Sequence, residues 1–196
     1  MPPADSNRLF FALWPGDIVR EASHQAARDL KLRMQPSGNL SSPARYHITL
    51  LFLGDQVPAD KEAAALQAAT TVRAAPFELR LDHAGSFRNP RQVPWWLGAR
   101  EMPSGLQVLY ERLREALGRA GVPPERMRFV PHLTILRDQK MILPTTAIKP
   151  IAWSVDEFVL IRSHVERQPA EYELLGRWPL TAAPEPDPAA QLNLWG

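Results

Sequence analysis

The alternation of apolar and polar positions along the chain predicts a mixture of strands and helices. Residues 7–14 are mostly apolar and end at a Pro-Gly pair, as is typical of a buried strand. The next segment, 18–34, carries an apolar residue at every fourth position, which predicts an amphipathic helix with Asp17 as its N-cap. The members of this apolar stripe are Ile18, Ala22, Ala26, Leu30 and Met34.

The remainder of the chain continues this mixed pattern. Apolar or alternating runs predict strands over 47–53, 77–81, 95–98 and 132–136, and a terminal hairpin over 155–165 and 172–178. Helices are predicted over 58–72 and 104–121, the second with Ser104 as N-cap, with loops over 36–43 and 85–92 and a Pro-containing connection before the hairpin. This order predicts an α+β fold of two similar halves around a central cleft.

Length and composition limit the class of protein. A chain of 196 residues with 45% hydrophobic content suits a single two-lobed domain, which we expect over residues 1–181, followed by a flexible Pro- and Ala-rich tail over 182–196. No apolar run approaches the roughly 18 residues of a membrane span and no signal peptide is recognisable, so we expect a soluble, cytoplasmic protein and, by default, a monomer. The absence of cysteine excludes a thiol nucleophile, and a net charge of +2 argues against a strongly basic nucleic-acid coat.

One tetrapeptide pattern occurs twice. His47-Ile48-Thr49-Leu50 recurs 85 positions later as His132-Leu133-Thr134-Ile135. A shuffled chain of this composition would contain the pattern only roughly 0.005 times, so we interpret the pair as a functional repeat, the alternative being that each His caps or packs its strand. Because alternate side chains of a strand share a face, each His points the same way as its Thr. Two imidazoles and two hydroxyls are therefore expected in one cleft.

Such a set suits the opening of a cyclic phosphodiester. The reaction takes a proton from the attacking water and gives one to the departing sugar oxygen, and a neutral and a protonated imidazole, with an ordinary pKa of about 6.5, can do both. The two hydroxyls can bind the non-bridging oxygens, so no metal or cofactor is needed. A zinc site is the competing interpretation, but neither tetrapeptide holds an acidic residue and no His-x-x-x-His occurs. Nucleophile-elbow and phosphate-loop motifs are also absent.

The repeat and its flanks resemble the 2H phosphoesterase superfamily, and in particular the bacterial RNA 2′,3′-cyclic phosphodiesterases, also called 2′-5′ RNA ligases. The likeness extends to about Leu180 and is carried by residues 8–13, 46–54, 85–87, 96–98 and 129–137. It implies a two-lobed α+β fold in which each lobe is an antiparallel sheet with helices outside.

The resemblance also implies residue roles. His47 would be the proton donor to the leaving 3′ oxygen and His132 the proton acceptor that activates water, with a 2′-phosphate as product. Thr49 and Thr134 would bind the phosphate, and the reverse reaction would give 2′-5′ ligation. Arg137 corresponds to an arginine near the phosphate, although its odd offset from His132 requires a bulge or a strand end between them. Alternative substrates are a small cyclic nucleotide or ADP-ribose cyclic phosphate, and the alternative class is a non-catalytic RNA-end binder.

Other candidates are less specific. Arg45 precedes His47 and could touch an RNA backbone, although we expect it to be solvated. Aromatic residues could stack on the terminal base, although most should be core: Phe10, Phe11, Tyr46, Phe87, Trp95 and Trp96. The histidines without a Thr partner are expected to be structural or exposed: His24, His83 and His164. The tail resembles the Gln-Leu-x-Leu-Phe peptide that docks on the bacterial DNA sliding clamp, through Gln191, Leu192, Leu194 and Trp195.

Overall fold

The computed structural model describes residues 7–89, 91–126, 128–138, 140–164 and 170–181. The strands are β1 (Asn7–Leu13), β2 (Asn39–Leu40), β3 (Ile48–Asp55), β4 (Phe77–Ser86), β5 (Val93–Gly98), β6 (Leu133–Asp138), β7 (Thr146–Val155), β8 (Glu157–His164) and β9 (Glu171–Pro179). The helices are α1 (Asp17–Met34), α2 (Ala59–Thr70), α3 (Ser104–Arg119) and the 3₁₀ turn η1 (Pro43–Arg45). The predicted tail, 182–196, lies outside the described residues.

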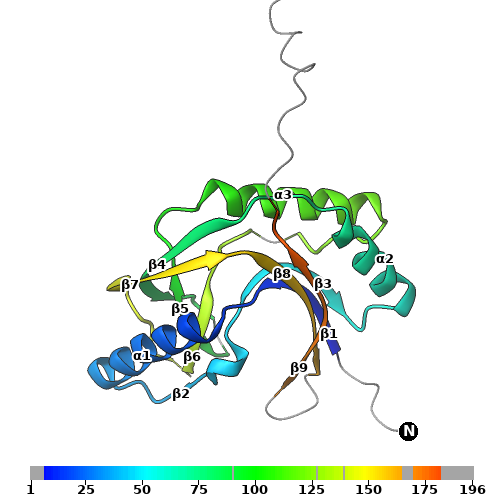
Figure 1. The fold of residues 1–196 in the computed structure, drawn as a ribbon. Coiled ribbons are helices and arrows are strands. Elements are labelled where there is room, and N and C mark those ends of the chain that lie inside the picture. The colour runs from blue at the N-terminus through cyan, green and yellow to red at the C-terminus, as the bar shows by residue number, and fades with distance from the viewer. Residues whose placement is uncertain (1–6, 90, 127, 139, 165–169, 182–196) are drawn as a thin grey trace, which may run out of the picture.

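The strands form one curled sheet built from two halves. Its order is β7-β4-β5-β6-β3-β1-β8-β9, every pairing is antiparallel, and β2 adds to β6. The halves β7-β4-β5-β6 and β3-β1-β8-β9 meet where Ile48 pairs with Leu133. In Figure 1 the sheet arches, and α2 and α3 run along its outer side. The predicted α+β, two-lobed architecture is confirmed.

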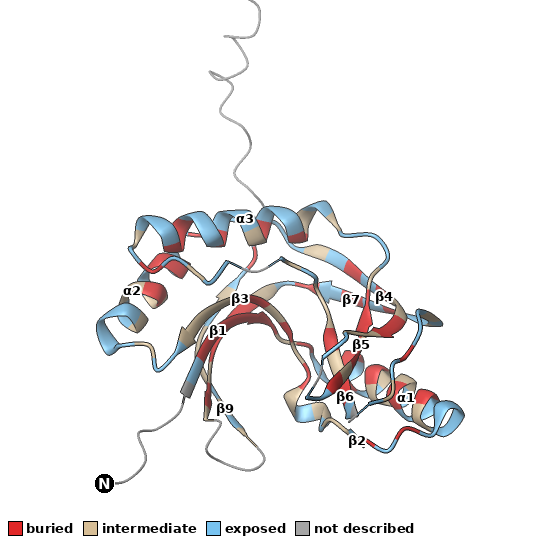
Figure 2. Cartoon of the chain, turned by 180° about the vertical axis from the view of Figure 1, so that it is seen from behind, coloured by how far each residue is buried: buried red, intermediate tan, exposed pale blue. Residues whose placement is uncertain are grey.

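The two faces of the sheet bury different clusters. Along β1, Phe11 belongs to the main core under the helices, whereas Phe10 and Ala12 belong to a smaller cluster with Val159 and Ile161. Figure 2 shows buried residues concentrated on the sheet and on the helix faces turned toward it. Alternation on β1 therefore separates the main core from the inner, concave face.

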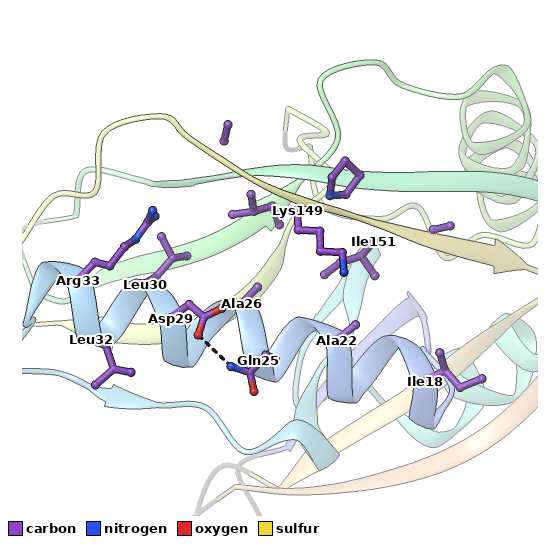
Figure 3. A pocket seen from close by; sticks show the side chains of 14 residues that line it. Ile18, Ala22, Gln25, Ala26, Asp29, Leu30, Leu32, Arg33, Lys149 and Ile151 are labelled. Carbon is purple, nitrogen blue, oxygen red and sulfur yellow. Dashed lines mark hydrogen bonds between the residues drawn. The ribbon is translucent and has the colours of Figure 1, made fainter.

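Helix α1 packs only in part as its apolar stripe predicts, because Leu30 is buried and Ala22 and Ala26 pack against the main core but Ile18 does not. Its buried positions include Val19, Ser23 and Ala27, while Ile18 is 87% exposed. Part of the stripe lines a groove of about 720 Å³ between α1 and β7. Figure 3 shows Ala22 and Ala26 on the α1 side of this groove and Ile151 on the β7 side. This groove holds none of the predicted site residues.

Other local predictions were wrong for identifiable reasons. Asp17 is the first residue of α1 and not its cap, and Ser104 likewise begins α3 after an N-cap at Pro103. The Pro-containing connection contains strand β7, which tolerates Pro150 because β7 lies at the edge of the sheet. The loop over 36–43 contains β2 and runs into η1.

No helix among the described residues is long and apolar enough to cross a membrane.

Candidate active site

The two motifs meet at the seam between the halves of the sheet. Ile48 pairs with Leu133 in antiparallel register. Extending this register by one residue on each side sets His47 opposite Thr134 and Thr49 opposite His132. Ile48 and Leu133 are both fully buried in the main core, so the histidines and threonines point to the other, concave face. His47 and His132 are diagonal neighbours, about 7–8 Å apart at their backbones in ideal pairing. We call the concave surface that carries His47, Thr49, His132 and Thr134 the candidate cleft.

Both imidazoles are held in the same way by the backbone. Nδ1 of His47 lies 2.8 Å from the carbonyl oxygen of Arg45, and Nδ1 of His132 lies 2.7 Å from that of Val130. A carbonyl only accepts hydrogen bonds, so each Nδ1 carries the proton and donates it. Each neutral ring consequently presents an unprotonated Nε2, the atom that can exchange a proton with a substrate.

Aromatic rings fix the two imidazoles from the side. His47 lies 5.1 Å from the ring centre of Phe10 and meets Tyr172 edge to face at 5.4 Å. His132 meets Phe87 edge to face at 4.7 Å, and Phe87 in turn lies 5.2 Å from Trp96. The rings restrict rotation of each imidazole and remove water from around it.

Burial and nearby cations make both histidines weak bases. Burial lowers the pKa of His47 to about 4, and the positive charges of His132, Arg45 and Arg137 add to this, against the opposing effect of the Arg45 carbonyl. Burial likewise lowers the pKa of His132, again with a contribution from Arg137. Both rings are therefore neutral near pH 7 in the free protein. An anion bound between them would raise both pKa values.

A bulge in β6 returns Arg137 to the cleft. Thr134 pairs with Trp96 but Leu136 pairs with Trp95, so Ile135 is passed over by the ladder. Ile135 and Leu136 are both buried in consequence, and Arg137 recovers the face of Thr134. The bulge that the position of Arg137 required is confirmed.

The comparisons with known proteins show the family of the chain. The sequence model of the 2′-5′ RNA ligase superfamily matches residues 18–167, which include both motifs. The chain belongs to the 2′-5′ RNA ligase superfamily.

Relatives of known name or structure cover most of the chain. The protein is 35% identical over 181 residues to the RNA 2′,3′-cyclic phosphodiesterase of Escherichia coli K12, and the match spans 91% of this chain and 99% of that one. The crystal structure of E. coli LigT complexed with 3′-AMP is 34% identical, with a TM-score of 0.70 over 91% of this chain and 99% of that one. A protein structure from Thermus thermophilus superposes with a TM-score of 0.74 at 28% identity, covering 90% of this chain and 100% of its own.

In this member of the 2′-5′ RNA ligase superfamily, the cleft has one residue that the sequence did not indicate. Tyr172 contacts His47, and the guanidinium carbon of Arg45 lies 5.2 Å from the Tyr172 ring. No local signal marks Tyr172, because it reaches the cleft only through the pairing of β9 with β8 and of β8 with β1. Arg45 is partly buried by this contact, contrary to the expectation of a solvated loop arginine, and its Nε has no hydrogen-bond partner among the described residues.

The aromatic residues and histidines named from the sequence lie partly in the core and partly beside the cleft. Phe11, Tyr46 and Trp95 are fully buried core residues, whereas Phe10, Phe87 and Trp96 lie at or beside the cleft. The other histidines have partners elsewhere: Tyr46 for His24, Asp82 for His83 and Glu173 for His164. Within the described ranges, no cluster of three or more His, Cys, Asp or Glu could hold a metal ion.

Proposed function

We propose that this protein hydrolyses 2′,3′-cyclic phosphate ends of RNA to 2′-phosphates without a metal. The observation that carries the proposal is the pair of imidazoles set diagonally across the Ile48–Leu133 pair, each with Nε2 available and each opposite a threonine. The E. coli relative is named an RNA 2′,3′-cyclic phosphodiesterase, and LigT was crystallised with 3′-AMP. A phosphorus atom between the two Nε2 atoms would have a base on one side and an acid on the other.

The residues take the following roles in this proposal. Nε2 of His132 removes a proton from water, whose oxygen attacks phosphorus while the bond from phosphorus to the 3′ oxygen breaks. Protonated Nε2 of His47 gives its proton to that leaving 3′ oxygen, so the product is a 2′-phosphate. Thr49, Thr134 and Arg137 stabilise the charge that grows on the non-bridging oxygens. The assignment of acid and base follows the family resemblance.

The substrate itself prepares His47 for this role. With a pKa of about 4, His47 is rarely protonated in the free protein at pH 7. A bound phosphodiester carries a negative charge between the imidazoles and opposes the cations that lower the pKa of His47. Proton uptake by His47 is therefore coupled to binding of the anionic substrate.

An assay on defined RNA ends tests the function. An oligonucleotide ending in 2′,3′-cyclic phosphate is incubated with the protein in EDTA, and the product is identified by its mobility and phosphatase sensitivity. We expect a 2′-phosphate, and a loss of about 10²- to 10⁴-fold in rate for His47→Ala and for His132→Ala. Inhibition by EDTA, or full activity in both variants, would overturn the proposal. Turnover of a cyclic mononucleotide but not of RNA would identify the alternative substrate class.

We further propose that the same two imidazoles catalyse the reverse reaction, in which an RNA 5′-hydroxyl attacks the cyclic phosphate and yields a 2′-5′ linkage. Water at its normal concentration favours hydrolysis. Incubation of concentrated paired RNA ends should give a ligated product whose junction resists a nuclease specific for 3′-5′ linkages. His47→Ala should lose ligation and hydrolysis together.

We propose that the tail docks on the DNA sliding clamp through Gln191, Leu192, Leu194 and Trp195. Support comes from the match of this segment to a Gln-Leu-x-Leu-aromatic peptide. Fluorescence titration of a tail peptide against purified clamp should show saturable binding, and a peptide with Leu192 and Trp195 replaced by Ala should not bind. Absence of saturation would remove the idea.

We also propose that residues 1–181 act as one domain in a cytoplasmic monomer. One sheet includes both halves of the described chain, joined at the Ile48–Leu133 pair, which supports a single cooperative unit. Light scattering coupled to gel filtration should give the mass of one 22.1 kDa chain. Cell fractionation should recover the protein in the cytosolic fraction, and its recovery with the membranes would contradict this location.

A further inference from the structure

Helix α1 turns polar side chains toward the loop that carries His47. Arg20 is buried and His24 is partly buried, and both contact the segment that precedes β3. Arg20 and His24 are one helical turn apart and so share a face. They contact Pro43 and Tyr46, the residues on either side of the short segment that ends at Arg45.

Arg20 is held by a carbonyl and an aromatic ring. Its Nη1 donates to the carbonyl oxygen of Pro43, and its guanidinium carbon lies 4.4 Å from the centre of the Trp14 ring. Only 9% of Arg20 is exposed, and burial lowers the pKa of its guanidinium, with Asp17 offsetting part of this effect. Among the described residues no carboxylate lies within salt-bridge distance of Arg20, and its Nη2 has no hydrogen-bond partner.

Burial of such a residue has a cost. A buried cation without a carboxylate at salt-bridge distance is costly even with Asp17 offsetting part of the effect, and apolar residues of similar volume are often as stable or more so at buried ionic positions. A guanidinium nevertheless occupies this place and binds the backbone next to a catalytic histidine. Its contribution therefore lies in the geometry of that backbone.

A second anchor lies one turn further along α1. The hydroxyl of Tyr46 is 3.1 Å from Nδ1 of His24, and Tyr46 is fully buried. Burial raises the pKa of Tyr46, so its phenol stays protonated and can donate to His24. Tyr46 immediately precedes His47, and its backbone N–H donates to the carbonyl of Pro43, 3.1 Å away, which also accepts from Arg20.

These anchors bracket the carbonyl that orients His47. The backbone N–H of Arg45 closes η1 by donating to the carbonyl oxygen of Ser42, with 2.9 Å between nitrogen and oxygen. The carbonyl oxygen of Arg45 in turn accepts the Nδ1 proton of His47, with 2.8 Å between the two heavy atoms. Pro43 and Tyr46, on either side, are tied to α1. We propose that Arg20 is a positioning residue for His47, acting through η1: it fixes the Arg45 carbonyl so that His47 keeps its Nδ1–H tautomer and aims Nε2 into the cleft, with His24 and Tyr46 as the second anchor.

The functional consequence rests on the proposed role of His47, while the tautomer claim does not. The test compares Arg20→Met, which keeps volume but removes the donor, with Arg20→Lys, which keeps a charged donor. Arg28→Met is the matched control, because Arg28 lies on the same helix and is exposed. Urea unfolding of each variant reports whether it folds. Tyr46→Phe, which removes only the hydroxyl, serves as an independent variant should Arg20→Met fail to fold.

Steady-state kinetics on the cyclic-phosphate RNA give the first readout. We expect Arg20→Met to lower kcat by about 10- to 100-fold with KM changed less than about 2-fold, since small misplacement of a catalytic group can cost about 100-fold. Arg20→Lys should recover most of the kcat, Tyr46→Phe should lose about 3- to 10-fold, and Arg28→Met should match the wild type.

Nitrogen NMR of His47 in the free protein gives the second readout. The wild type should show one tautomer with the proton on Nδ1, and Arg20→Met should show a mixture of tautomers with Arg20→Lys close to the wild type. Normal kcat in Arg20→Met, or a lower kcat with an unchanged His47 tautomer, would overturn the positioning role. Failure of the proposed function looks different: His47→Ala would then retain the activity of the wild type, whatever the tautomer in the Arg20 variants.

Discussion

Phe52 holds in β3 the place that Arg137 holds in β6, three residues beyond the motif threonine and just past a bulge. In β3 the ladder with β1 passes over Leu50, as the ladder of β6 with β5 passes over Ile135. The internal symmetry of the sheet therefore extends beyond the motifs, and it is broken by one charge. At this pair of positions β6 carries a cation and β3 an apolar ring.

This asymmetry predicts a specific cost for Arg137→Ala. The guanidinium is the charged group that the bulge brings to the face of Thr134, and a hydrogen bond to a charged partner is worth about 1.5–3 kcal/mol. We expect kcat/KM for cyclic-phosphate RNA to fall by about 10- to 150-fold. Arg80→Ala, an exposed arginine on β4, is the control and should match the wild type. Equal activity of the two variants would show that Arg137 does not touch the phosphate.

The rate should depend on pH as a bell displaced to the acid side. Burial lowers the pKa of His47 to about 4 and that of His132 below its ordinary 6.5, and one ring must carry a proton while the other must not. We expect kcat/KM to fall below about pH 4, where His47 takes up its proton. It should fall again above the pKa of His132, which lies below 6.5. The kcat profile should lie at higher pH, because the bound anion raises both pKa values. A plateau of kcat/KM extending above about pH 7 would contradict the placement of these rings.

Acid should destabilise the fold through His47. Its pKa is lower in the folded chain than the ordinary 6.5, so the unfolded chain binds the proton more tightly and stability falls as pH drops from about 6.5 to about 4. The loss amounts to about 3 kcal/mol. His47→Gln should abolish this part of the pH dependence. Urea unfolding at about pH 7 and about pH 4.5 measures it, and parallel losses in both proteins would refute the attribution.

Two glycines offer a matched test of packing beside His132. A Cβ on Gly85 would lie 2.8 Å from the Trp96 ring, whereas one on Gly118 in α3 meets nothing within 4 Å. Gly85→Ala should cost about 1–3 kcal/mol and lower activity, because Trp96 supports Phe87 against His132. Gly118→Ala should instead stabilise by about 0.5–1 kcal/mol without effect on activity. Thermal unfolding and the RNA assay read both outcomes.

The sequence predicted the parts of the site that depend on local periodicity. The His-x-Thr spacing indicated the shared face of His47 and Thr49, and the odd offset of Arg137 indicated the need for a bulge that β6 contains. These features need only a period of two and a hydrophobic face. The pairing of Ile48 with Leu133 was not predicted, because sequence spacing does not show that the two motif strands are neighbours.

Contacts between distant segments were beyond such reasoning. Tyr172 reaches His47 through strand pairings that link β9, β8, β1 and β3, and no property of its neighbours in the chain indicates that. The apolar stripe of α1 begins at Ile18, which is exposed. The alanines of the stripe offer little apolar area to bury, and the polar face of the helix is fixed instead by the hydrogen bond of Arg20 to Pro43. Helical periodicity identifies the helix but not which side docks when a buried arginine competes with small apolar residues.

The seam at Ile48 and Leu133 has a consequence for the order of assembly. The half β7-β4-β5-β6 is drawn from the continuous stretch 77–155, whereas the half β3-β1-β8-β9 joins residues near the start of the chain to strands that follow residue 156. During translation the His132 half can form while the His47 half still waits for β8 and β9 to leave the ribosome. The half that carries His47 is therefore complete only when β8 and β9 have emerged.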